Sequence, residues 1–531
     1  MFYYQKKHIF APDNIIEIGQ PIFKSMRKLT KHETDLLMAN GCQAEDWENV
    51  WVSEPFEANR VQNVKFYGRV CLGSNAGTIE VVDGFEKPCG VRNVTLRNVV
   101  VGDDSLIEDT TLVANTVKEG EELIIPVLNE AGDGNVMLYS GLSSQLAALQ
   151  IRYAGDAQLV QTLQNLIKKS EGYDAQCSFI GHHTCISGAG KIVNSHVGNY
   201  CYVGENVILE GCFVGESTTI TNGFTAEHSL FFANTYMANG EACAAFCGPF
   251  SASHHKGSLL IGVDVSFYNA GSATNFSNHA YKMGPLHYGT LQRGTKTASG
   301  AHILLPAQVG PYSMCMGKIQ SHPDTRQMPF SYLIASGEDT MLIPARGLLT
   351  VGLFRDVEKW PKRDKRPADD RVSHISHQWL SPYTLQAVRK GKAELEALLQ
   401  GHTESDTYRY NGCRIRRHSL LTGIKIYDLA LRLVENPAPE EEWSDLGGML
   451  LPKSTELKLV EDIKSGRISS LKEVYAQLDA IYEQHNQPTQ FVPEVVDEWY
   501  DFISMDAQKE YDLGDVDKEV LDAFLKKLKI N

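Results

Sequence analysis

Residues 180–247 read IGHHTCISGAGKIVNSH, VGNYCYVGENVILEGCF, VGESTTITNGFTAEHSL and FFANTYMANGEACAAFC when the chain is divided after every seventeenth residue. The rows agree at their first, seventh and thirteenth positions, where apolar or β-favouring residues recur. These positions hold Ile180, Val197, Val214 and Phe231; Ile186, Val203, Ile220 and Met237; and Ile192, Leu209, Ala226 and Cys243. Each row therefore consists of two steps of six residues and one step of five.

A repeat of fixed length predicts a solenoid, because each row can bury its apolar residues only against the rows before and after it. Three short strands per row predict a triangular coil, with strands of successive rows about 4.8 Å apart. The fifth position of each row carries a small side chain that suits a narrow corner: Thr184, Cys201, Thr218 and Thr235. We therefore expect a mainly β protein built on a parallel β-helix.

These four rows resemble the transferase-hexapeptide superfamily, whose fold is the left-handed parallel β-helix. The whole chain also resembles an uncharacterised family in which a hexapeptide core lies between an N-terminal cap and a helical C-terminal region. The resemblance to hexapeptide proteins implies a homotrimer. It also implies acyl transfer from acetyl-CoA or another acyl donor to an amine or hydroxyl, often with a histidine base between subunits.

The rest of the chain divides around this core by changes in its pattern. The expected segments are an N-terminal arm and capping helix in 1–60, a first β-helix portion in 61–118, a loop and helical insertion in 119–176, the main β-helix with long loops and terminal strands in 177–354, a charged linker in 355–375, and an α-helical region in 376–531.

Helices are expected wherever capping signals and one apolar face coincide. Thr30 and Glu33 form a capping-box pattern before an N-terminal helix, and Gly155 interrupts a helical segment at 144–170. The C-terminal helices are expected at 376–400, 416–436, 454–464, 468–485, 493–505 and 517–528.

Composition restricts the possible partners and compartment. The 531 residues carry a net charge of −15, which argues against sequence-independent binding to nucleic acid. No run approaches the roughly 18 apolar residues of a membrane helix, and the first residues lack the apolar core of a secretory signal. The eleven cysteines include several at inward positions and no C-x-x-C pair, so we expect a soluble cytoplasmic protein with small buried thiols.

Histidines of the regular rows and of the irregular coils after residue 247 are the candidate general bases, because the pKa of histidine lies near neutral pH. The first choice is His279, with Asn275 and Asn278 to orient its ring or hold a carbonyl oxygen; His228 and His254 are further candidates. The alternative is that these polar residues only satisfy the backbone of exposed turns.

A glycine-bounded loop, LQRGTKTASG, supplies Arg293 and Lys296, which with His302 could hold the phosphates of an acyl donor or a sugar nucleotide. The alternative is that this loop is exposed to solvent and its charged side chains bind no ligand. No pair of histidines occurs seventeen residues apart in the regular rows, so no metal site is predicted there within one chain; a metal held by ligands from two subunits is the open alternative.

The sequence leaves two functions open. One is acyl transfer to a sugar or sugar-nucleotide acceptor, in a cleft against a neighbouring subunit. The residues expected to form this cleft are Asn275, Asn278, His279, Arg293, Lys296 and His302. The other is a non-catalytic scaffold or binding protein built on a β-helix. Residues 1–118 lack the strand, glycine loop and helix that a nucleotidyltransferase domain requires, so that activity is not expected.

Overall fold

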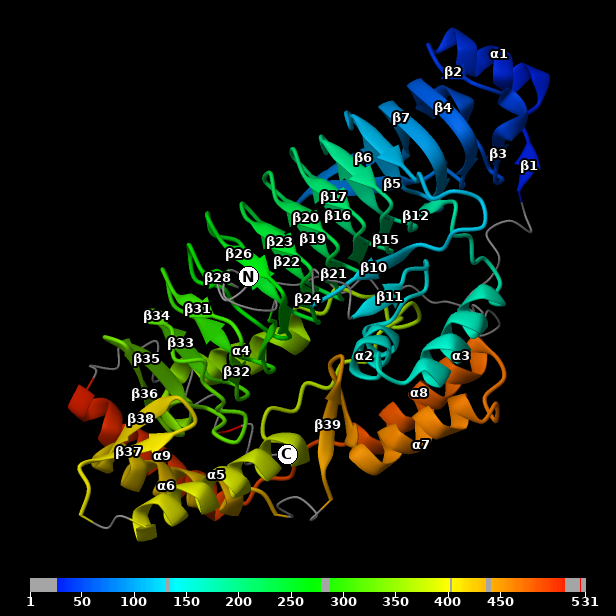
Figure 1. The fold of residues 1–531 in the computed structure, drawn as a ribbon. Coiled ribbons are helices and arrows are strands. Elements are labelled where there is room, and N and C mark those ends of the chain that lie inside the picture. The colour runs from blue at the N-terminus through cyan, green and yellow to red at the C-terminus, as the bar shows by residue number, and fades with distance from the viewer. Residues whose placement is uncertain are drawn as a thin grey trace.

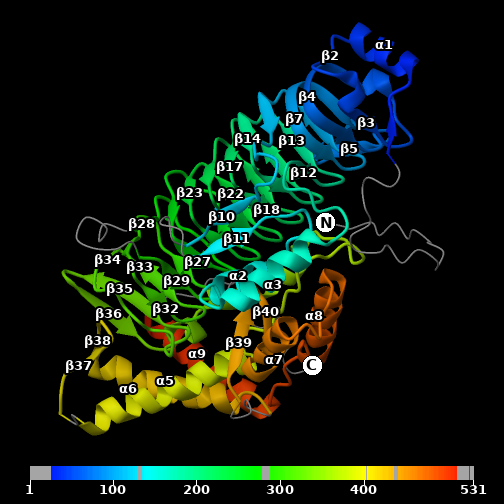
Figure 2. The same cartoon turned by 45° about the vertical axis from the view of Figure 1, so that its right-hand side comes forward.

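The computed structural model describes residues 26–128, 134–277, 287–401, 404–435, 441–510 and 526. A long parallel sheet of short strands coils along the molecule, and helices cover one of its sides and its far end (Figures 1 and 2). The protein is therefore mainly β, with a β-helix-like core and a helical C-terminal region. No helix within the described ranges is long and apolar enough to cross a membrane.

The coils stack their strands in three columns, which we call A, B and C. Column A continues the end of β7 (Gly90–Val101) and contains β12 (Ser178–Ile180), β15 (His196–Val197), β18 (Phe213–Val214), β21 (Leu230–Phe231), β24 (Phe246–Cys247), β27 (Val263–Val265), β29 (Gly289–Leu291) and β32 (Gln308–Val309). Each strand pairs in parallel with the next strand of its column.

Column B contains β8 (Leu106–Glu108), β13 (Cys185–Ser187), β16 (Tyr202–Gly204), β19 (Thr219–Thr221), β22 (Tyr236–Ala238) and β25 (Ala252–Ser253), and continues through a bridge at Asn269 to β30 (Lys296–Thr297), β33 (Met314–Met316) and β35 (Tyr332–Ser336). Column C contains β9 (Leu112–Ala114), β14 (Lys191–Val193), β17 (Ile208–Glu210), β20 (Thr225–Glu227), β23 (Glu241–Cys243), β26 (Leu259–Ile261), β28 (Asn275–Ser277), β31 (His302–Leu304) and β34 (Lys318–Ile319).

The register confirms the seventeen-residue repeat in the first rows and shortens it in the fourth. Ile186 lies opposite Val203, and the same spacing continues down that column. In column C, however, Ala226 lies opposite Ala242 and not opposite Cys243, so this row has sixteen residues. The expectation that Cys243 occupies the inward column was therefore wrong, and its side chain is only partly buried.

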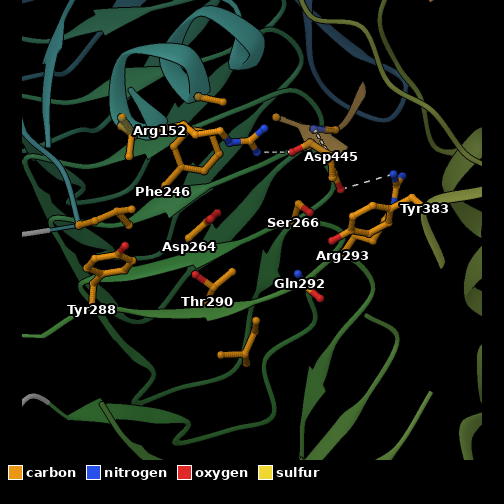
Figure 3. A pocket seen from close by; sticks show the side chains of 16 residues that line it. Arg152, Phe246, Asp264, Ser266, Tyr288, Thr290, Gln292, Arg293, Tyr383 and Asp445 are labelled. Carbon is orange, nitrogen blue, oxygen red and sulfur yellow. Dashed lines mark hydrogen bonds and ion pairs between the residues drawn. The ribbon is translucent and has the colours of Figure 1, made fainter. Parts of the chain in front are cut away.

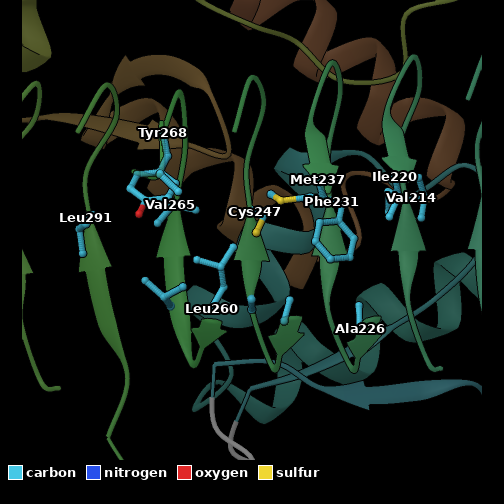
Figure 4. Close-up of a cluster of buried hydrophobic side chains, with 14 of the residues drawn as sticks. Val214, Ile220, Ala226, Phe231, Met237, Cys247, Leu260, Val265, Tyr268 and Leu291 are labelled. Carbon is cyan, nitrogen blue, oxygen red and sulfur yellow. The ribbon is translucent and has the colours of Figure 1, made fainter. Parts of the chain in front are cut away.

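Apolar side chains from all three columns fill the coil interior (Figure 4). Polar side chains near the corners satisfy the carbonyl groups of the next coil. Thr184 Oγ1 donates to the Gly198 carbonyl at 2.7 Å, and Thr218 Oγ1 donates to the Phe232 carbonyl at 3.1 Å. These bonds explain the small polar residues at the fifth position, because a buried hydroxyl is costly without a partner.

The N-terminal unit closes one end of the coil. Helix α1 (Lys31–Ala39) begins with the expected capping box, in which Thr30 and Glu33 each bond the other's backbone. Strands β2 (Gln43–Ala44) and β3 (Val50–Val52) pair in parallel with β4 (Val61–Leu72), and β4 pairs with β7. Strand β1 (Arg27–Lys28) pairs with β3 in the antiparallel direction. These pairings cover the edge of β4 at the first coil, where an unpaired strand edge would favour aggregation.

Two excursions leave the early coils. The first is the hairpin of β5 (Thr78–Val82) and β6 (Phe85–Pro88), which the sequence pattern did not predict. The second contains the hairpin of β10 (Ile124–Pro126) and β11 (Asn135–Met137), followed by α2 (Ser144–Arg152) and α3 (Ala157–Lys168). The break between these helices lies at Gly155, as expected.

The helical region confirms five of the six expected C-terminal helices; the sixth, at 517–528, lies outside the described residues apart from 526. They are α5 (Pro382–Gly401), α6 (Arg417–Arg432), α7 (Lys453–Lys464), α8 (Leu471–His485) and α9 (Pro493–Glu510). The first part of the expected charged linker at 355–375 is not a linker but the second half of α4 (Val351–Lys362). This segment is helical because its apolar side chains, including Phe354 and Val357, pack into the core.

Three further hairpins and pairings occur beside these helices. They are β35 with β36 (Asp339–Ile343), β37 (Thr407–Tyr410) with β38 (Cys413–Arg416), and β39 (Trp443–Leu446) with β40 (Met449–Pro452).

The apolar faces of α2, α3, α7 and α8 form one cluster with outward side chains of column A. The insertion and the C-terminal helices thus cover column A jointly (Figure 2).

Candidate functional site

The outward side chains of column A change from apolar to polar where this helical cover ends. Successive strands place His196, Phe213, Leu230, Phe246, Asp264, Thr290 and Gln308 at equivalent outward positions. Phe213, Leu230 and Phe246 belong to the apolar cluster beneath the helices. Asp264 and Thr290 instead face a cavity of about 310 Å³, which we call the column A cavity.

Three parts of the chain, distant in sequence, enclose the column A cavity (Figure 3). Its floor is formed by β27 and β29, one wall by the end of α2, and the other by the β39–β40 hairpin and the start of α5. The residues lining it are Leu128, Ala148, Ile151, Arg152, Phe246, Asp264, Ser266, Tyr288, Thr290, Leu291, Gln292, Arg293, Tyr383, Asp445, Gly447 and Gly448. Small-molecule sites have volumes of roughly 300–1,000 Å³, so the cavity is large enough for a small polar ligand.

Asp264 is the carboxylate on the floor of this cavity. Burial raises its pKa to about 7, although the positive charge of Arg152 acts in the opposite direction; the nearby Asp445 contributes to the increase. No described residue donates a hydrogen bond to its side chain. A carboxyl group that titrates near neutral pH can both accept and return a proton, which is the requirement for a general base.

Arg293 is 1% exposed and extends from the loop after β29 to the opposite wall. Its Nη2 donates to the Ser376 carbonyl, its Nη1 lies 3.4 Å from Asp445 Oδ2, and its guanidinium lies 4.6 Å above the Phe267 ring. Its Nε and Nη1 atoms make no hydrogen bond of good geometry with any described residue. A fully buried arginine with N–H groups to spare indicates a site for an acceptor atom from a ligand.

The wall that faces Arg293 is held by an ion pair between Glu456, which is fully buried, and Arg152, whose side chain is 33% exposed. Arg152 Nη1 lies 2.7 Å from Glu456 Oε2, and Arg152 also donates to Ser444 Oγ and the Asp445 carbonyl, both at 2.6 Å. Burial acts to raise the pKa of Glu456, but Arg152 and Lys453 outweigh it and hold that pKa near 2. These contacts fix the β39–β40 hairpin against α2 and so define the shape of the cavity.

A second chamber of about 270 Å³ adjoins the first and shares Arg152, Gln292, Tyr383 and Asp445 with it. Three further cationic side chains, Arg326, Lys390 and Lys453, line this outer chamber, whereas Glu442 is its one additional carboxylate. The lining of this chamber therefore has more cationic side chains than that of the first cavity, although Arg326 pairs with Asp324 and Lys453 with Glu456. This difference suits a ligand with a neutral polar part in the first cavity and an anionic group in the second chamber.

The residues predicted from the sequence lie on three different faces of the coil. Arg293 is in the column A cavity. Lys296 faces outward on column B, where it pairs with Asp356 of α4. His302 lies on column C opposite Asn275. The structure thus does not bring Arg293, Lys296 and His302 into one cleft, because the loop that carries them turns a corner at Gly294.

The remaining predicted residues are dispersed as well. His254 and Lys296 line one cavity on the outer face of column B. His228 lies on a turn, where its Nδ1 is 3.8 Å from Glu227 Oε1. Asn278 and His279, the preferred catalytic pair, lie outside the described residues. Within the part of the chain that the structure describes, no three His, Cys, Asp or Glu side chains are arranged to hold a metal ion.

Sequence reasoning missed Asp264, Arg152, Asp445 and Tyr383. The one usable signal was Asp264, a charged residue between two valines at the column position that Phe213, Leu230 and Phe246 occupy in earlier coils. The other three lie on the insertion and the C-terminal region. Only the tertiary structure brings them to column A.

Comparison with known proteins gives a family but no activity. The family model described as Domain of unknown function (DUF4954) matches residues 26–119, 109–210 and 201–399, and Domain of unknown function (DUF6819) matches residues 430–515. The chain is also similar to an "Uncharacterized protein" of Treponema pallidum (strain Nichols). They are 20% identical over 590 residues, which cover 86% of this chain and 80% of the other protein.

Proposed function

Since the chain belongs to the DUF4954 family, whose description states no function, we propose one from the site: a left-handed β-helix transferase that acylates a hydroxylated small molecule in the column A cavity. The single observation that carries this proposal is the position of Asp264 on the floor of a cavity that the buried Arg293 also lines. A base and an N–H donor that face one cavity are the parts that acyl transfer requires.

In the proposed reaction, Asp264 accepts the proton of an acceptor hydroxyl while that oxygen bonds to the carbonyl carbon of an acyl thioester. The carbon–sulfur bond then breaks, and the proton returns from Asp264 to the leaving thiolate. Arg293 donates N–H bonds to the oxygen on which negative charge develops. Acetyl-CoA is the simplest donor of this class, and Asp264 takes the role that the sequence suggested for His279.

The outer chamber favours an acceptor with an anionic group. Arg326, Lys390 and Lys453 would hold a phosphate there, while hydroxyl groups reach Asp264, Thr290 and Gln292 inside. A sugar phosphate or sugar nucleotide has this division into a neutral ring and a charged end. We therefore propose phosphorylated sugars as the acceptor class.

The Asp264→Asn variant tests the role of the base. We expect its rate of acyl transfer to fall by about 10²-fold or more, since removal of a general base typically costs 10²–10⁴ in rate. The wild-type rate should rise with pH up to about 7, because only the ionised carboxylate accepts a proton. Transfer is followed by mass spectrometry of a panel of sugar phosphates incubated with acetyl-CoA and other acyl-CoA donors.

The control is Asp35→Asn, which removes an exposed carboxylate from α1 at the far end of the coil. This variant should keep the wild-type rate and pH profile. An Asp264→Asn enzyme with an unchanged rate would rule out the proposed base. If no donor and acceptor pair reacts in the wild type while the cavity still binds ligands, the scaffold or binding-protein alternative is the better explanation.

A stability measurement checks the electrostatics of Asp264 without an assay. Its pKa is about 7 in the folded protein and about 3.9 in an unfolded chain. Between these values the folded state binds more protons, so ionisation destabilises the fold progressively as pH rises from 4 to 7. Asp264→Asn should therefore melt at a higher temperature than wild type at pH 8, and the difference should shrink at pH 4. Equal differences at both pH values would contradict the raised pKa.

A homotrimer also belongs to this proposal. A triangular coil offers flat faces for packing, and column C carries an exposed apolar side chain, Ile208. Analytical ultracentrifugation should give a mass of three chains at micromolar concentration. A monomer at that concentration would exclude the trimer, although the column A cavity would remain complete within one chain.

A further inference from the structure

The outer face of column B forms a second cavity, distinct from the proposed transferase site. It measures about 580 Å³ and lies between the coil and helix α4 with the segment after it; we call it the column B groove. It shares no lining residue with the column A cavity or its outer chamber. Its lining residues are Ser217, Thr219, Asn234, Thr235, Tyr236, Phe250, Ala252, His254, Phe267, Tyr268, Asn269, Lys296, Asp356, Lys359, Trp360, Arg363 and Lys365.

Positive charge gathers in this groove although the whole chain carries a net charge of −15. Lys359, Arg363 and Lys365 contribute side chains that form no ion pair with other described residues. Lys296 is the one lining cation with a carboxylate partner, Asp356. Three unpaired cations in one groove create a positive potential that attracts an anionic ligand.

Ser217 supplies an unused hydrogen-bonding group at the floor of the groove. The residue is 6% exposed, and its Oγ atom is buried without a hydrogen-bond partner among the described residues. A buried hydroxyl without a partner is uncommon in folded proteins. A ligand oxygen or nitrogen in the groove would satisfy it.

Two aromatic rings flank the charged groups. Tyr236 is 40% exposed and projects outward from β22, with its ring centroid 6.2 Å from that of His254. Trp360 of α4 is held in place by an edge contact with Phe267 at 5.0 Å. Aromatic side chains beside cations are the combination that holds a base by stacking and its phosphates by charge.

We infer that the column B groove binds a nucleoside phosphate, with the phosphates on Lys359, Arg363 and Lys365 and the base against Tyr236 or Trp360. The groove is well within the range of cofactor sites, roughly 300–1,000 Å³. This site does not depend on the proposed transferase activity. Its test is binding, so the two proposals can fail separately.

Calorimetric titration of the full chain with the di- and triphosphates of adenosine, guanosine, cytidine and uridine tests this site. We expect at least one to bind, with an affinity that falls as salt is added. The Lys359→Glu/Arg363→Glu variant should bind at least about tenfold more weakly, because it replaces two attractive charges by repulsive ones. The matched control is Lys362→Glu, which reverses a charge on the same helix at a residue that does not line the groove and pairs with Glu358.

Ser217→Ala gives an independent check that keeps every charge, and it should also weaken binding. Pyrophosphate and the free nucleosides complete the series. Pyrophosphate binding as tight as that of the nucleotide would overturn the nucleoside assignment, and equally tight binding by free nucleosides would overturn the phosphate assignment. No binding of any nucleotide, or equal affinity in Lys359→Glu/Arg363→Glu and Lys362→Glu, would overturn the site itself.

Discussion

Replacing Phe231 by alanine should destabilise the coil around it by about 3–5 kcal/mol, as large-to-small changes of buried aromatic residues do. Phe231 is fully buried on the inward side of β21, between Val214 and Cys247 of the neighbouring coils. Its ring packs against Phe224 with centroids 5.9 Å apart. The strands above and below hold their spacing through backbone hydrogen bonds, so the coil cannot collapse to fill the cavity.

The matched control for this prediction is Ile208→Ala in β17. Ile208 points outward on column C and is 39% exposed, so its truncation should cost about 0.5 kcal/mol or less. Hydrogen exchange of the strand amides measures both changes locally, which matters because a long repeat array need not unfold in one step. Equal loss of protection in the two variants would contradict the assignment of inward and outward positions.

Replacing Arg366 by methionine should cost about 3–5 kcal/mol, the usual penalty for leaving a buried charge without its partner. Arg366 and Glu216 both have side chains that are 3% exposed, and their charged atoms lie 3.1 Å apart. Arg366 also pairs with Asp364 at 2.9 Å and donates to the Ser373 carbonyl. This cluster attaches the segment after α4 to the coil, so we expect that segment to detach or unfold first.

Acid should affect the same attachment in wild type. Burial acts to raise the pKa of Asp364, but its bonds with Arg366 outweigh burial and lower that pKa to about 2. The stabilisation is therefore complete above the unfolded value of about 3.9 and disappears as pH falls toward 2.

The control for the charge cluster is Arg467→Met. Arg467 bonds Asp462 at 2.6 Å, but its side chain is mostly exposed, and such surface pairs contribute about 0–1 kcal/mol. Limited proteolysis between α4 and α5 and urea unfolding at pH 7 and pH 3 compare the two variants. Similar stability of Arg366→Met and Arg467→Met at pH 7 would show that the buried cluster contributes little.

The sequence alone determined the coil, because its periodicity is a local property. A strand column needs an inward residue at a constant spacing, and that spacing is visible in Ile186, Val203, Ile220 and Met237 without any knowledge of contacts. Capping residues likewise predicted α1, since Thr30 and Glu33 act within one turn. The shortened fourth row was missed because one residue fewer at a corner leaves the apolar pattern almost unchanged.

Only the tertiary structure decided where the cavities are. Arg293 and Lys296 are three residues apart and were predicted to serve one phosphate site, yet a corner of the coil directs them to columns A and B. The walls of the column A cavity come from α2 and the β39–β40 hairpin, which meet through Arg152 and Ser444, 292 residues apart. Contacts across such separations depend on how the helices pack, and no local pattern in the sequence records that packing.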